Sequence, residues 1–201
     1  MRLSILICLT ALLPGTVWLT GCASIGDQIK DEFSSYAEPK EGELAHIRLI
    51  GSRQVKVYPN STCVNPGAPG SGYPNGWQMY GQRKRDLGMP KLLQTPRHYI
   101  EIAARAAQPI TAAFSFQTSL FPQKTPWSSG GNVINVNLCN IAYSFVPVAG
   151  AHYEVVAREN RRVCSVDLTQ LTPAADGTWQ AVHLPGREVG HCGTSPVAAA
   201  H

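Results

Sequence analysis

The chain has 201 residues, of which 44% are hydrophobic and 15% are charged. This length suits one domain of ordinary size, and the hydrophobic content excludes an intrinsically disordered protein. The formal net charge of +4 is divided unevenly along the chain. Residues 22–43 carry two lysines against six acids, a net of −4, whereas the region from residue 44 onward carries 14 basic against 7 acidic residues, a net of +7.

The N-terminus has the layout of a secretory signal peptide. A basic start, Met1-Arg2, precedes an apolar run over residues 3–19 that Pro14-Gly15 interrupts. A membrane-spanning helix needs about 20 uninterrupted apolar residues, so this run is too short and too broken to span. We therefore expect residues 1–21 to be removed from the mature protein and exclude them from the fold.

The end of this segment, Leu19-Thr20-Gly21-Cys22, resembles the lipobox of bacterial lipoproteins. The resemblance implies cleavage before Cys22 and attachment of a diacylglycerol, with acyl chains such as palmitate, to its thiol; several acyl chains on one residue suffice for durable anchoring. Because Ala23 rather than Asp follows, the resemblance also implies an outer-membrane anchor that faces the periplasm. An ordinary secreted protein with Cys22 merely near the cut is the alternative.

Three segments follow the signal peptide. Residues 22–43 form an acidic tether, either a short amphipathic helix, since Ile25, Ile29 and Phe33 recur every four residues, or a solvated linker. Residues 44–195 form the folded domain, and residues 196–201 form a flexible tail.

Apolar residues alternate with polar ones through most of the domain, which is typical of half-buried β-strands. Residues 45–57 predict a β-hairpin that turns at Gly51-Ser52, and further strands are expected at 99–105, 112–116, 134–138, 141–145, 153–157, 163–168 and 179–184. The apolar positions change parity between the two strands that flank Cys139-Asn140, which predicts a bulge or turn there. Residues 64–97 and 118–132 predict two long loops. About eight short strands favour an all-β fold, an antiparallel β-sandwich or partial barrel.

Four cysteines remain once the signal peptide is cut and Cys22 is acylated: Cys63, Cys139, Cys164 and Cys192. In an oxidising compartment they predict two disulfides. A four-cysteine zinc site is disfavoured because no C-x-x-C spacing exists. Three pairings are possible, and we expect Cys63–Cys139 and Cys164–Cys192, since the last two cysteines lie close together in sequence.

No catalytic or metal-binding motif stands out, so we expect neither enzyme activity nor a cofactor nor a bound metal. The Gly190-His191-Cys192-Gly193 stretch is not a nucleophile–base pair, because adjacent residues on a strand point to opposite faces. Glu101 and Glu154 lie on the polar faces of predicted strands and are expected to be solvated.

One loop has the composition of a binding surface. Residues 64–97 hold Tyr73, Trp77, Tyr80 and the run Arg83-Lys84-Arg85, and aromatic and arginine side chains dominate the energetics of interfaces. The alternative is a loop whose aromatic rings pack back onto the sheet.

Two functional hypotheses follow. In the first, the chain is a non-catalytic, lipid-anchored periplasmic protein that binds another protein; a lipobox before a small disulfide-linked β-domain resembles the immunity and accessory lipoproteins associated with type VI secretion. In the second, its basic face binds anionic lipid head groups or peptidoglycan. Nucleic acid is an unsuitable partner in the periplasm.

Overall fold

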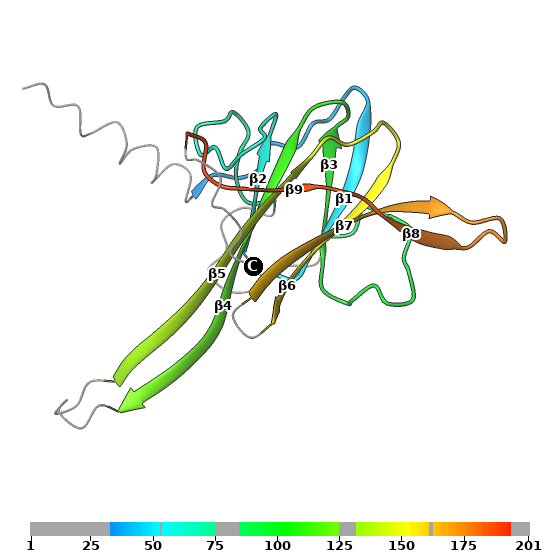
Figure 1. Cartoon of the computed structure of the whole chain (residues 1–201). Coiled ribbons are helices and arrows are strands. Elements are labelled where there is room, and N and C mark those ends of the chain that lie inside the picture. Colours follow the sequence, from blue (N-terminus) through cyan, green and yellow to red (C-terminus); the bar gives the residue numbers. More distant parts are fainter. Residues whose placement is uncertain (1–32, 53, 75–84, 125–131, 161–162, 194–201) are drawn as a thin grey trace, which may run out of the picture.

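The computed structural model describes residues 33–52, 54–74, 85–124, 132–160 and 163–193, and these residues form an all-β fold (Figure 1). Alternating apolar residues produce the strands, as expected. The described part of the chain contains nine strands: β1 (Leu44–Ile50), β2 (Gln54–Pro59), β3 (Ile100–Arg105), β4 (Ile110–Lys124), β5 (Asn132–Phe145), β6 (His152–Asn160), β7 (Val163–Pro173), β8 (Trp179–His183) and β9 (Arg187–Val189).

The strands form two sheets that enclose one core. One sheet has the order β3-β1-β6-β7-β8 and the other β2-β4-β5-β9. Apolar side chains from both sheets meet between them, among them Ile47, Ile102 and Val155 from the first and Val57 and Phe114 from the second. The all-β, sandwich-like prediction is confirmed. The five-stranded sheet is mixed rather than purely antiparallel, because β1 and β6 pair in parallel.

The hairpin predicted over residues 45–57 is wrong. β1 pairs with β3 and β6, whereas β2 pairs with β4 in the opposite sheet. The apolar residues of the two strands face each other across the core instead of lying side by side, and Gly51 makes the turn between the sheets. Gly51 has φ of +116°, and a side chain there would collide with the backbone of Ala157.

The second predicted loop is also wrong, because residues 118–124 and 132 belong to strands. β4 and β5 remain paired out to Lys124 and Asn132, and this long hairpin projects from the body of the domain (Figure 1). The irregularity expected at Cys139-Asn140 lies in the facing strand instead, where the register shifts between Gln117 and Leu120. The first predicted loop, in its described residues 64–74 and 85–97, contains no named strand.

All four domain cysteines form disulfides, but the pairing is Cys63–Cys192 and Cys139–Cys164, which corrects the expected one. Distance along the sequence did not predict the pairing, because the arrangement of the strands in the two sheets determines which cysteines lie close together. After β9 the chain runs beside Val64, where the Val64 N–H donates to the Gly190 carbonyl at 2.9 Å, and this brings Cys192 to Cys63. The other bridge joins β5 to β7 and so ties the two sheets together.

The described part of the expected tether packs against the domain. Ser35 pairs with Tyr73, and the Tyr36 ring is buried in the core, where its hydroxyl donates to the Ala103 carbonyl at 2.9 Å. Burial of this ring raises the pKa of Tyr36 above its ordinary value. Residues 22–32 lie outside the described residues.

Candidate functional site

The outer face of the five-stranded sheet carries a buried cluster of charges. Arg48 on β1 lies opposite Glu101 on β3 and Glu154 on β6. Its Nε and Nη2 donate to Glu101 Oε1 at 2.9 and 2.7 Å, and its Nη1 donates to Glu154 Oε1 at 2.5 Å. Arg48 and Glu101 are 0% exposed and Glu154 is 5% exposed. The prediction that the two glutamates are solvated is wrong.

This cluster is buried because the segment Arg85–Arg97 crosses over it. The N–H groups of Leu87 and Met89 donate to Glu101 Oε2, the second at 3.4 Å, and Arg48 Nη2 donates to the Met89 carbonyl at 3.1 Å. Arg48 therefore holds two strands and the covering segment at once.

The far half of the same segment is fixed through Thr95. Its hydroxyl donates to Glu154 Oε1 at 3.3 Å and accepts from the Leu92 N–H at 2.9 Å. The guanidinium group of Arg48 lies 4.8 Å from the centre of the Tyr99 ring, just after the segment ends. Removing one partner from a buried, hydrogen-bonded ion pair costs about 3–5 kcal/mol. The segment is therefore held in one position over the sheet.

The fixed segment forms one wall of a groove. A hollow of about 570 Å³ lies between residues 92–96 of the segment and the outer faces of β6, β7 and β8. A second hollow of about 590 Å³ lies between Lys91–Gln94 and residues 178–181 at the start of β8. Leu92, Gln94 and Ala181 line both hollows, so the two hollows adjoin each other. In Figure 1 the β7–β8 hairpin extends beyond the body of the domain at this place.

The groove has an apolar rim at its β8 end. Leu93 is fully exposed, and Trp179 is 37% exposed. Leu93 and Trp179 both line the second hollow. Exposed large apolar side chains that gather at one place are typical of binding surfaces, whereas scattered ones need no explanation.

A row of rings connects this rim to the charge cluster. His46 and His152 stack with their centres 5.4 Å apart, and the edge of Trp179 meets His152 at 5.8 Å. Burial, followed by the effects of His46 and Arg48, lowers the pKa of His152 below its ordinary value. Neutral His152 is therefore the favoured form, and its buried Nδ1 has no hydrogen-bond partner in the described structure.

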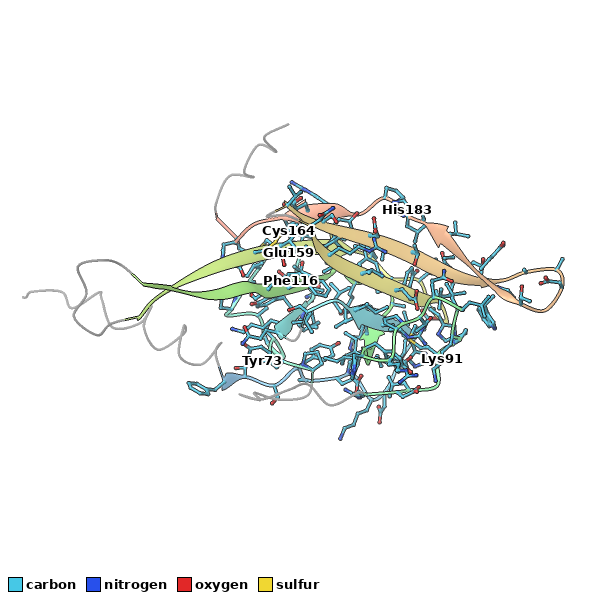
Figure 2. All side chains as sticks on the ribbon, turned by 90° about the horizontal axis from the view of Figure 1, so that it is seen from below. Tyr73, Lys91, Phe116, Glu159, Cys164 and His183 are labelled. Atoms are coloured by element: carbon cyan, nitrogen blue, oxygen red, sulfur yellow. A yellow bond between two sulfur atoms is a disulfide. The ribbon has the colours of Figure 1, made fainter. Side chains whose placement is uncertain are left out.

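The two described residues among those predicted for binding, Tyr73 and Arg85, do not line this groove. Tyr73 is buried; its backbone pairs with residues 34–36 and its ring lies 5.0 Å from Lys56 Nζ. Arg85 forms an ion pair with Glu38. Figure 2 shows Tyr73 well away from Lys91, which lines the groove. Trp77, Tyr80, Arg83 and Lys84 lie outside the described residues.

Sequence reasoning missed the groove because both of its walls depend on long-range pairing. The available signal was the opposite charge of Arg48 and the two glutamates on the polar faces of neighbouring strands, which favours cross-strand pairs. That signal is useful only once the strand order is known. Trp179 was placed on a strand, but nothing in its local sequence indicated an open side.

The described residues contain no group of three or more His, Cys, Asp or Glu side chains arranged to hold a metal ion. Among them there is also no helix with the length and apolar character needed to cross a membrane.

Comparison with known proteins gives no family assignment. No protein-family model, no curated protein and no solved structure matches the chain. Function must therefore be argued from the site.

Proposed function

We propose that this chain is a lipid-anchored binding protein of the bacterial envelope and that its partner is another protein. The anchor is an acylated Cys22 in the outer membrane, an expectation that rests on the Leu19-Thr20-Gly21-Cys22 sequence. The domain is held in the periplasm, where an immunity or secretion-accessory protein would meet its partner. Two disulfides are in keeping with this oxidising compartment.

The observation that carries the proposal is the groove between the segment Arg85–Arg97 and β8. A buried ion cluster fixes one wall, and exposed Leu93 and Trp179 line the rim. A wall that is already ordered reduces the entropy lost on binding. A rim with an aromatic anchor suits a protein surface better than a small polar ligand.

Photocrosslinking in intact cells tests this proposal. A photoreactive amino acid replaces Gln94, which lines both hollows, and the control carries it at Val148, which is exposed and lines neither. We expect a discrete protein adduct from position 94 that position 148 does not give. Adducts only with lipid or glycan, or the same adduct from both positions, would contradict the proposal.

A second candidate function is supported by a different surface. Lys40 and Arg105 line a hollow of about 480 Å³ beside residues 36–40, which lead toward Cys22. Neither cation forms an ion pair with a described acid. Two cations without a described ion-pair partner suit an anionic lipid head group or glycan. Sedimentation of the lipid-free domain with anionic vesicles, compared with a Lys40→Gln/Arg105→Gln variant, tests it; equal sedimentation of both proteins would contradict it.

A further inference from the structure

The two sheets have four edges, and other described segments of the chain pair with two of them, β2 and β3. Val57 on β2 exchanges two backbone hydrogen bonds with Gly72, at 2.9 and 3.0 Å. Beside β3, the Glu101 N–H donates to the Arg85 carbonyl at 3.0 Å and the Ala103 N–H donates to the Glu38 carboxylate. At the third edge, β9 is only three residues long and carries Arg187 and Glu188, and residues 190–192 just beyond it pair with Val64.

The fourth edge, the outer side of β8, is open. No described segment pairs with it, since β8 ends its sheet and its only strand partner is β7. The Leu184 N–H donates to the Leu168 carbonyl at 2.9 Å, which fixes the phase of the ladder. Every second residue points its backbone groups toward β7, so those of Trp179, Ala181 and His183 point to the open edge.

β8 also lacks the features by which proteins protect an open edge. Its sequence, Trp-Gln-Ala-Val-His, contains no proline, lysine or acidic residue, and its register with β7 runs without a bulge from Trp179 to His183. All five residues are exposed. The side chains of Ala181 and His183 face the first hollow, and that of Trp179 lines the second.

We propose that a partner protein binds by adding an extended strand to the open edge of β8. Main-chain hydrogen bonds to Trp179, Ala181 and His183 supply the affinity, and an apolar side chain of the added strand packs against Trp179 and Leu93. This inference rests on the proposed protein-binding function and names the surface and the kind of partner.

The occupant is a segment of a second protein rather than a second copy of this chain. The region from residue 44 onward carries a net charge of +7, which opposes association between copies and attracts an acidic partner. The added strand is therefore extended, net acidic, and apolar at alternate positions on the side that faces Leu93. Pairing between two β8 strands is one of the outcomes that the test distinguishes.

The probe is an acetylated and amidated heptapeptide, Asp-Val-Glu-Val-Asp-Val-Glu, with a fluorescent label, titrated against the lipid-free domain. The controls are two versions of the same peptide, each N-methylated at alternate amides, one version at the odd and the other at the even amides. In one of the two versions the amides that face β8 therefore cannot donate hydrogen bonds. We expect binding of the parent peptide, and binding at least tenfold weaker for one N-methylated version because two or more hydrogen bonds are lost. Hydrogen exchange at the Ala181 and His183 amides should slow when the parent peptide binds.

Two variants of the protein localise the effect. Ala181→Pro removes an N–H that faces the open edge and leaves the ladder to β7 intact, so it should fold and bind the peptide at least tenfold less tightly. Val182→Thr, at a position whose backbone groups face β7 and whose side chain lines neither hollow, should bind within about twofold of the unsubstituted protein. If Ala181→Pro does not fold, the N-methylated peptides still decide the question.

Each other result overturns the inference. Absence of peptide binding, equal binding of all peptide versions, or protection confined to other amides would exclude strand addition at β8. Protection of Ala181 and His183 that depends on protein concentration alone would identify a second copy as the occupant. A protein adduct from position 94 that persists in full-length Ala181→Pro would overturn this inference and leave the proposed function standing, whereas absence of any protein adduct would remove the proposed function.

Discussion

Replacing Arg48 by Met tests the role of the buried charge cluster. The substitution removes four hydrogen bonds and leaves Glu101 and Glu154 buried without their cation. A buried ion pair that loses one partner destabilises a protein by about 3–5 kcal/mol. For a domain of this size, 1 kcal/mol shifts the Tm by about 2–4 °C, so we expect a fall of roughly 6–20 °C. Circular dichroism melts with the disulfides intact measure it.

A matched triple variant separates the charge effect from lost packing. Arg48→Met combined with Glu101→Leu and Glu154→Leu removes all three charges, and replacing a whole buried ion cluster by apolar residues is often neutral or stabilising. We therefore expect the triple variant to recover more than half of the lost Tm. The Leu87 and Met89 amides should still exchange faster than in the unsubstituted protein, because the carboxylate that accepts their hydrogen bonds is gone. A single variant within about 2 °C of the unsubstituted protein, or a triple variant as unstable as the single one, would refute this reasoning.

Cys22→Ser should abolish incorporation of labelled palmitate, and unchanged label would contradict the anchor. Peptide mapping of the oxidised protein should recover the pairs Cys63–Cys192 and Cys139–Cys164, and loss of either bridge should cost about 2–5 kcal/mol of stability. The pKa of His152 is lowered in the folded state, so the unfolded state binds more protons as the pH falls, and stability is lost below about pH 6.5. His152→Phe should therefore flatten the dependence of Tm on pH between 7 and 5. An unchanged slope would contradict this assignment.

The strands could be predicted from the sequence because their pattern is local. Ile100, Ile102 and Ala104 were assigned to one face by alternation, and all three are buried in the core. The same pattern could not give the strand order. β1 pairs in parallel with β6, more than 90 residues away, and no local signal specifies a parallel partner.

The charge cluster shows why the site could not be predicted. On a sheet with one solvated face, polar positions such as Glu101 are expected to be exposed. Here the irregular segment Arg85–Arg97 covers that face, and its backbone N–H groups find acceptors in the glutamate. Those hydrogen bonds are donated by the backbone of Leu87 and Met89. They do not depend on the side chains, so they could not be predicted from the residue types in the sequence.

The edges at β2, β3 and β9 differ from the edge at β8 in the segments of the chain that lie beside them. The segments that cover β2 and β3 belong to the long connection between those two strands and to the stretch before β1, and the Cys63–Cys192 bridge holds Val64 beside the end of β9. β8 lies at the far edge of its sheet, on a hairpin that extends beyond the body of the domain (Figure 1). The segment Arg85–Arg97 approaches β8, but its hydrogen bonds to Glu101 and Glu154 fix the segment over β1, β3 and β6. The same contacts that bury the charge cluster therefore keep this segment from closing the edge, and they leave a groove between the segment and the strand. We accordingly expect Arg48→Met to loosen the groove wall and to weaken binding at β8 without any change in β8 itself. Titration of the peptide against that variant, at a temperature below its Tm, would measure the affinity. Unchanged affinity would show that the groove wall and the β8 edge act independently.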